Sequence, residues 1–125
     1  MMAAVPSIMF LPRGQHLLAD LSDIAPERLD DPHAIEQLLR EAALSAGATI
    51  LSSHFHHFGT HQGVTGVVLL AESHISIHTW PESGFAALDI FMCGNAHPEA
   101  ALQLIRAGLA AGNSSHRAIS RGGPQ

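Results

Sequence analysis

The segment from His74 to Trp80 alternates between two kinds of side chain, and this pattern constrains the fold more than any other part of the chain. An extended strand places alternate residues on opposite faces, so Ile75, Ile77 and Thr79 share one face. The other face carries polar and aromatic side chains: His74, Ser76, His78 and Trp80. The segment is therefore predicted to be a half-buried strand of a sheet.

Further strands and two helices are predicted around this segment. The remaining strands are expected at 15–21, 49–58, 64–71 and 85–93, with a short last strand at 115–119. One helix is expected to begin at Asp31-Pro32, with Asp as the cap and Pro in the first turn, and to end at Gly47. A second helix is expected over 97–111. This order predicts an α+β fold, a two-layer α/β sandwich with a mostly antiparallel sheet and two main helices.

A chain of 125 residues fits one domain, and its 46% hydrophobic content provides a small core that oligomerisation would help. We expect residues 1–13 to be a loose leader, 14–120 to form the domain and 121–125 to be a flexible tail.

Composition argues against several classes of protein. The net charge of −5, with only six Lys and Arg, argues against a nucleic-acid surface, because phosphate contacts need clustered cations. The apolar run 66–71 is too short to cross a membrane, and the N-terminal stretch lacks the basic residues of a signal peptide. The single cysteine, Cys93, excludes an internal disulfide. A cytoplasmic protein is the simplest interpretation.

Histidine is concentrated in the middle of the chain. Six of the ten histidines fall within 25 residues: His54, His56, His57, His61, His74 and His78. Such a cluster indicates a site, because histidine changes charge near neutral pH. One hypothesis is a non-enzymatic or cupin-like metal protein built on His54, His56, His61 and a carboxylate, since histidines two apart on a strand share a face. That hypothesis leaves Ser73 and Cys93 unexplained.

Ser73 lies at the junction of two predicted strands, five residues before His78. A Ser–His pair is the minimum for an activated hydroxyl, and Asp89 in the next strand could complete a Ser-His-Asp set. No G-x-S-x-G turn surrounds Ser73, so a hydrolase has little support. Taken alone, Ser73 and His74 are typical turn residues.

The stretch ESHISIHTWPE at 72–82, followed by GFAALDIFMCG at 84–94, resembles the prokaryotic S-adenosylmethionine decarboxylase family. The upstream pieces QHLLADL, GATILSSHFHHF and GVTGVVLLA resemble the same family in the same order, so the resemblance covers roughly residues 14–112. In this family a Glu-Ser-His segment is the self-cleavage site of a proenzyme.

The resemblance implies that the chain is cleaved between Glu72 and Ser73. Ser73 would attack the carbonyl of Glu72 in an N→O acyl shift, and β-elimination followed by hydrolysis would leave an N-terminal pyruvoyl group. His78 would take the Ser73 Cα proton during elimination, a role suited to a base with a near-neutral pKa. Thr65 matches a hydroxyl that in this family stabilises the tetrahedral intermediate of the acyl shift. The β-propensity of threonine explains its presence in a strand equally well.

The same resemblance implies the chemistry of the mature enzyme. The pyruvoyl group, a covalent cofactor generated from Ser73, would form a Schiff base with the substrate amine and accept the electrons left by CO2. No metal and no bound organic cofactor would then be needed. Cys93 matches the general acid that protonates the product carbon. Without the flanking FMCG match, a lone cysteine would be read as a buried small hydrophobe.

The implied substrate is S-adenosylmethionine, whose decarboxylated product donates aminopropyl groups for polyamine (spermidine) synthesis. Phe58 matches an aromatic that stacks on adenine, and Glu82 matches a carboxylate that binds both ribose hydroxyls. Trp80 would line the pocket or fill the core. The alternative is the same pyruvoyl chemistry on ornithine or arginine. The resemblance also implies a homodimer of cleaved protomers, with sites near the subunit interface.

Overall fold

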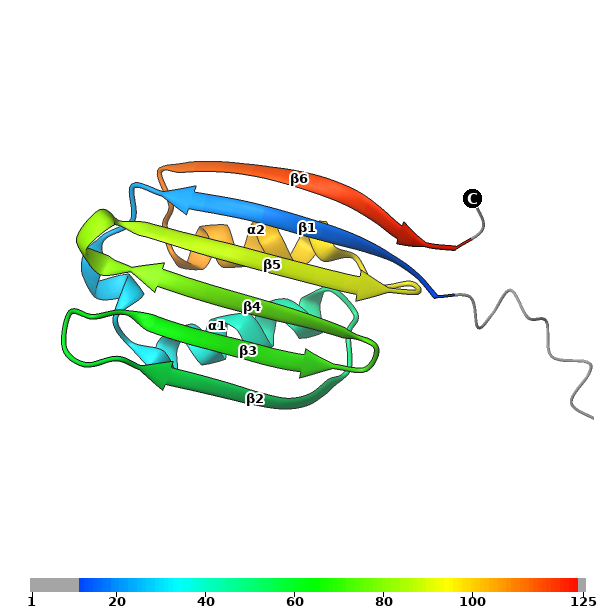
Figure 1. Cartoon of the computed structure of the whole chain (residues 1–125), viewed down its shortest axis with the longest axis horizontal. Helices are drawn as coiled ribbons and strands as arrows, with labels where there is room; N and C mark the ends of the chain where they lie inside the picture. Colours follow the sequence, from blue (N-terminus) through cyan, green and yellow to red (C-terminus); the bar gives the residue numbers. More distant parts are fainter. Residues whose placement is uncertain (1–11, 124–125) are drawn as a thin grey trace, which may run out of the picture.

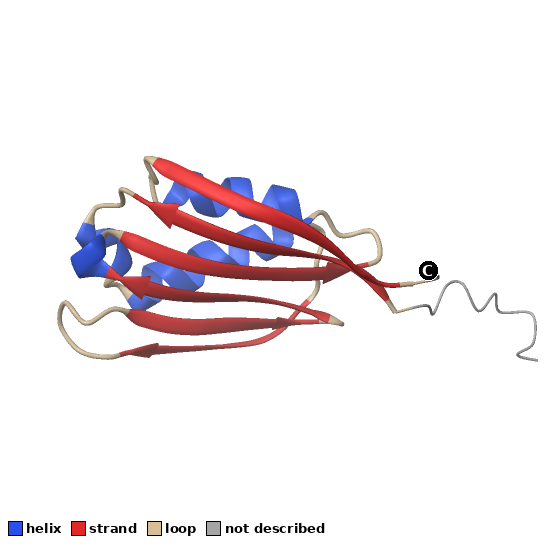
Figure 2. Ribbon diagram, turned by 45° about the horizontal axis from the view of Figure 1, so that its top comes forward, coloured by secondary structure: helices blue, strands red, loops and turns tan. Residues whose placement is uncertain are grey.

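A computed structural model describes residues 12–123, and it consists of one six-stranded sheet with two helices on one face (Figures 1 and 2). The strands are β1 (Arg13–Ser22), β2 (Ile50–His57), β3 (Val64–Leu70), β4 (Ser73–Trp80), β5 (Phe85–Cys93) and β6 (Asn113–Gly122). The helices are α1 (Pro32–Ser45) and α2 (Pro98–Gly108), with the 3-10 turns η3 (Pro26–Leu29) and η4 (Pro81–Ser83). Residues 1–11 of the expected leader and 124–125 of the expected tail lie outside the described residues.

The sheet has the strand order β2-β3-β4-β5-β1-β6, and every neighbouring pair is antiparallel. The predicted α+β sandwich is therefore confirmed, and β5 has the predicted bounds. Asp31 caps α1 as predicted, because its side chain accepts hydrogen bonds from the backbone N–H groups of His33 and Ala34, each at 3.1 Å.

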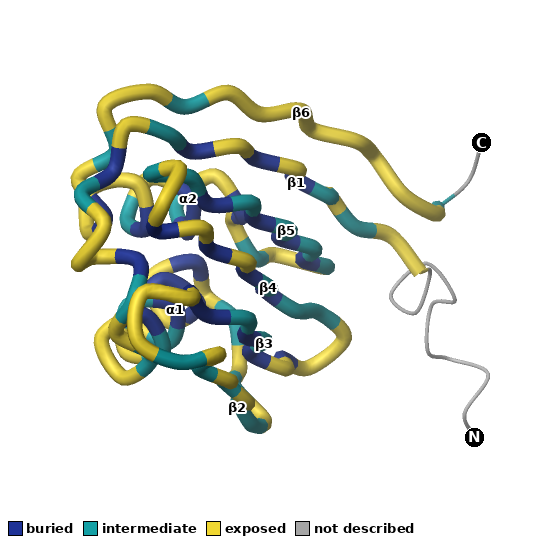
Figure 3. The backbone as a smooth tube through the Cα atoms, turned by 60° about the vertical axis from the view of Figure 1, so that its left-hand side comes forward, coloured by how far each residue is buried: buried dark blue, intermediate teal, exposed yellow. Residues whose placement is uncertain are grey.

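The last strand is longer than predicted. β6 spans Asn113–Gly122, where only a short strand at 115–119 and a tail from residue 121 were expected. It pairs with β1 along its whole length, from Arg13 opposite Gly122 to Ser22 opposite Asn113. Nearly all of its residues are exposed, as the colour of this outer strand in Figure 3 shows. The sequence therefore has no apolar periodicity from which the strand could be predicted.

The hydrophobic core lies between the helices and one face of the sheet. The buried side chains of the central strands include Leu17, Val68, Ile75, Ile77, Leu88 and Ile90, and those of the helices include Ile35, Leu39 and Ile105. Burying one such side chain stabilises a fold by roughly 1.5–3 kcal/mol. Ile75 and Ile77 are fully buried, which confirms the apolar face predicted for β4.

The opposite face of the sheet is covered by no helix or strand among residues 12–123 (Figures 1 and 2). We call it the open face, and its side chains include His16, Leu18, Thr65, Val67, Leu69, His74, His78, Trp80, Asp89, Phe91, Cys93 and Ile119. Leu18, Leu69 and Trp80 are each 42% exposed on it. None of the helices in the described part of the chain is long and apolar enough to cross a membrane.

Candidate functional site

The predicted cleavage point lies in a tight turn. Because Leu70 of β3 pairs with Ser73 of β4, only Ala71 and Glu72 connect the two strands. Glu72 has φ +61°, the left-handed region that a residue with a Cβ atom enters at a cost of about 1–2 kcal/mol. Backbone strain is thus stored on the amino side of the Glu72–Ser73 peptide bond.

Cys93, the last residue of β5, contacts this turn. Its thiol donates a hydrogen bond to the Glu72 carbonyl oxygen at 3.2 Å, and its backbone N–H donates to the Ser73 hydroxyl oxygen at 3.2 Å. The carbonyl that Ser73 would attack is therefore polarised by an S–H donor, a weak one. The structure brings together the two residues predicted to be nucleophile and general acid.

A second group of predicted residues gathers at the other end of the sheet. Thr65 of β3 and His78 of β4 face each other, with Oγ1 3.0 Å from Nδ1. Trp80 follows on the same face, with its ring centroid 6.3 Å from that of His78. Figure 1 shows that the β2–β3 loop, which carries Phe58, and the η4 turn, which carries Glu82, belong to this same end.

The two groups are too far apart to act on each other within one chain. Ser73 and His78 are five residues apart on β4, which at about 3.3 Å per residue separates them by about 16 Å. The Ser73–His78 pairing considered from their spacing is therefore wrong for a single protomer. Asp89 hydrogen-bonds to His16 and His74 and to neither residue of this pair, so a Ser-His-Asp set does not form.

Asp30, which sequence reasoning missed, anchors the loop that carries Phe58. One of its carboxylate oxygens accepts hydrogen bonds from His57 Nε2 at 2.9 Å and from the Gly63 N–H at 3.2 Å, and the other accepts from the His61 N–H at 2.8 Å. The hydrogen bond from His57, followed by that from His61, lowers the pKa of Asp30. Because Asp30 follows η3 and the loop precedes β3, no local pattern links them.

Phe58 itself is not a core side chain. It is 57% exposed, and its ring contacts His56 edge to face with centroids 4.6 Å apart. Glu82 is exposed as well. These side chains are free to line a binding surface at this end of the sheet.

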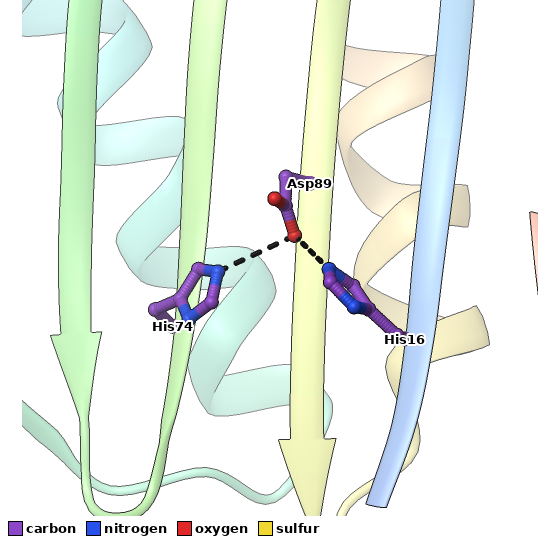
Figure 4. Close-up of side chains that lie close together, drawn as sticks. All are labelled: His16, His74 and Asp89. Carbon is purple, nitrogen blue, oxygen red and sulfur yellow. Dashed lines mark hydrogen bonds and ion pairs between the residues drawn. The ribbon is translucent and has the colours of Figure 1, made fainter. Parts of the chain in front are cut away.

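The three histidines considered as metal ligands do not form a metal site in the part of the chain that the structure describes. Within residues 12–123, His54, His56 and His61 form no group with a carboxylate. A different cluster does form at the centre of the open face, where His16, His74 and Asp89 meet from β1, β4 and β5 (Figure 4). His16 and Asp89 are 73 positions apart, so only the strand register brings them together.

Comparison with known proteins adds independent information. The sequence model of a family described as S-adenosylmethionine decarboxylase matches residues 15–122, which include the turn and both groups of residues. The chain is 51% identical over 94 residues to an S-adenosylmethionine decarboxylase proenzyme of Methanococcus aeolicus, covering 74% of this chain and 80% of that one. It is 48% identical over 112 residues to the proenzyme of Parasynechococcus marenigrum, covering 89% and 87%.

A solved structure agrees with these matches. The fold is similar to the adenosylmethionine decarboxylase from Aquifex aeolicus, with a TM-score of 0.81 and 39% sequence identity. The similarity covers 90% of this chain and 92% of that one.

Proposed function

This chain belongs to the S-adenosylmethionine decarboxylase family, and we propose from that premise that it decarboxylates S-adenosylmethionine with a pyruvoyl group made from its own Ser73. Its product would be the aminopropyl donor for polyamine synthesis. The names of the relatives and of the solved structure support adenosylmethionine over ornithine or arginine as the substrate.

The two contacts of Cys93, one with the Glu72 carbonyl oxygen and one with the Ser73 hydroxyl, are the observation that carries this proposal. The Ser73 hydroxyl adds to that carbonyl carbon, and the C–N bond breaks to leave an ester and a free amine on residue 73. Loss of the Ser73 Cα proton then expels Glu72 as a carboxylate and leaves dehydroalanine. Water replaces the amine nitrogen, ammonia leaves, and the new N-terminus is a pyruvoyl group.

The pyruvoyl ketone supplies the electron sink for the loss of CO2 from an amino acid. The chain's own contribution is the Cys93 thiol, which lies against the Glu72 carbonyl, next to the residue that would carry this ketone. It can deliver a proton to the substrate carbon from there. Phe58 and Glu82 would bind the adenine and the ribose, and Trp80 would line the same pocket.

The separation of the two groups supports a homodimer through the open face. A two-fold axis that lies parallel to the sheet, above its open face, and crosses β4 at right angles near its middle brings Ser73 and Cys93 of one protomer opposite Thr65 and His78 of its partner. Sheets that pack face to face lie about 10 Å apart, a distance that side chains bridge. The exposed apolar residues of the open face, Leu18, Leu69 and Ile119, would be covered in this dimer.

Cleavage and substrate are tested separately. The intact mass of the purified wild type should show fragments 1–72 and 73–125, whereas Ser73→Ala should remain one chain. Carboxyl-labelled adenosylmethionine, ornithine and arginine should then be compared for release of labelled CO2. Release of labelled CO2 from adenosylmethionine alone would support the proposal. A preference for ornithine or arginine would show that adenosylmethionine is not the substrate.

A further inference from the structure

The cluster at the centre of the open face centres on one oxygen of Asp89 (Figure 4). His16 donates to this oxygen through Nε2 at 2.5 Å, and His74 donates to it through Nε2 at 3.3 Å. Arg121 of β6 extends the network, with its guanidinium nitrogen 2.9 Å from His16 Nδ1. The network therefore crosses four adjacent strands, β4, β5, β1 and β6.

The Arg121 contact indicates which ring nitrogen of His16 donates a hydrogen bond and which accepts one. A guanidinium can only donate, so Nδ1 of His16 accepts and the ring proton is on Nε2, which faces Asp89. The His16 ring thus lies between a cation and an anion. His74 also presents an N–H to Asp89, because a carboxylate only accepts.

This arrangement of hydrogen-bond donors and acceptors favours a hydrogen-bonded network over a metal site. The three potential ligand atoms lie within 4.8 Å of one another, which is close enough for a metal ion. A metal on His16 Nε2 would need the proton on Nδ1, where it would point at the Arg121 guanidinium. Metal binding would thus break the Arg121 hydrogen bond.

His74 links the network to the cleavage point, because its backbone nitrogen is bonded to the carbonyl carbon of residue 73. The ring of Phe91 packs against both imidazoles, with centroids 5.4 Å from His16 and 6.1 Å from His74. Arg121 lies 6.0 Å from the centre of the same ring. The first side chain after Ser73 is thereby tied to the neighbouring strands at a point where β4 has just begun.

We propose that Asp89 is a positioning residue for residue 73: by holding His74, it fixes the Ser73–His74 peptide before cleavage and the amide of the pyruvoyl group afterwards. This inference rests on the proposed function. A small displacement of a reacting group lowers its rate steeply, so loss of the Asp89 charge should slow both cleavage and turnover. Binding of the nucleoside should be unaffected, because Phe58 and Glu82 lie at the other end of the sheet.

The test compares Asp89→Asn with Asp20→Asn, which removes the same charge from the open face of β1 without touching the cluster. Asp89→Asn should lengthen the half-time of cleavage by about tenfold or more and lower kcat of the cleaved enzyme, with KM for adenosylmethionine unchanged. Asp20→Asn should cleave and turn over like wild type. The unfolding temperatures of both variants, measured in the uncleavable Ser73→Ala background, should lie close together.

Three results would overturn the inference. The first is Asp89→Asn cleaving and turning over as Asp20→Asn does. The second is a collapse of its unfolding temperature, which would make the cluster purely structural. The third is stoichiometric uptake of zinc that Asp89→Asn abolishes. Failure of the wild type to cleave would instead count against the proposed function itself.

Discussion

Glu72 has a left-handed backbone, and its carbonyl, which accepts a hydrogen bond from the Cys93 thiol, is the group that we propose Ser73 attacks. Glycine adopts φ +61° without the penalty that a Cβ atom brings. Cleavage would remove the peptide bond that holds Glu72 in the turn and would release this strain. We therefore expect the strain at Glu72 to favour cleavage.

Glu72→Gly tests this role. In the Ser73→Ala background, glycine at this position should raise the free energy of unfolding by about 1 kcal/mol, measured by urea titration. In the chain with Ser73 intact, it should slow cleavage, measured as the rate at which fragments 1–72 and 73–125 appear. Ala71→Gly is the control, because Ala71 is not in the left-handed region and its replacement relieves no strain. Cleavage of Glu72→Gly at the wild-type rate would show that strain has no role.

At the scale of single elements, the loop between β2 and β3 is held by one side chain. Asp30 accepts hydrogen bonds from His57, His61 and Gly63, and these lower its pKa below the usual 3.8. A carboxyl whose pKa is lower in the folded state stabilises the fold above its unfolded pKa, and this contribution is lost as the pH falls through the folded pKa. The anchoring of the loop is thus a property of the ionised carboxylate.

Asp30→Asn should consequently be less stable than its parent at neutral pH, and the difference should shrink once the pH falls below 3.8. Urea unfolding of the Ser73→Ala protein with and without this change, at pH 7 and in acid, measures both quantities. Asp20→Asn is the control, because it also removes one carboxylate, from a residue that is exposed. A stability difference of the same size at both pH values would mean that Asp30 acts through shape and not through charge.

The elements also show what the sequence could predict. β4 was predictable because Ile75 and Ile77 are buried in alternation, whereas β6 has exposed side chains and is defined by its backbone pairing with β1. Ser73 and Cys93 were identified through a motif. Asp30 and the His16–His74–Asp89 cluster were missed, because strand register and loop packing bring them together from distant parts of the chain.

At the scale of the whole molecule, the residues proposed to form one site lie in two separate groups within a protomer. Ser73 and Cys93 lie at one end of the open face, and Thr65 and His78 at the other. The proposed two-fold dimer would make two complete sites from these groups. Each protomer would then depend on the base of its partner for cleavage.

Mixed dimers test this dependence. Ser73→Ala and His78→Ala should each remain uncleaved alone, but in a mixed dimer the Ser73→Ala chain offers its His78 to the intact Ser73 of the other chain. Co-expression with distinct tags should therefore yield cleaved His78→Ala chains, detected by mass. A chain that carries both changes should fail as the partner. Equal failure of both partners would mean that His78 does not act across the interface.

The most direct test of the account is the mass of the protein before and after incubation with adenosylmethionine and cyanoborohydride, which reduces the imine formed by a ketone and an amine. We expect two fragments, 1–72 and 73–125, and an increase in mass on the 73–125 fragment alone that requires the substrate. A single uncleaved chain of 125 residues, or two fragments that gain no mass, would contradict it.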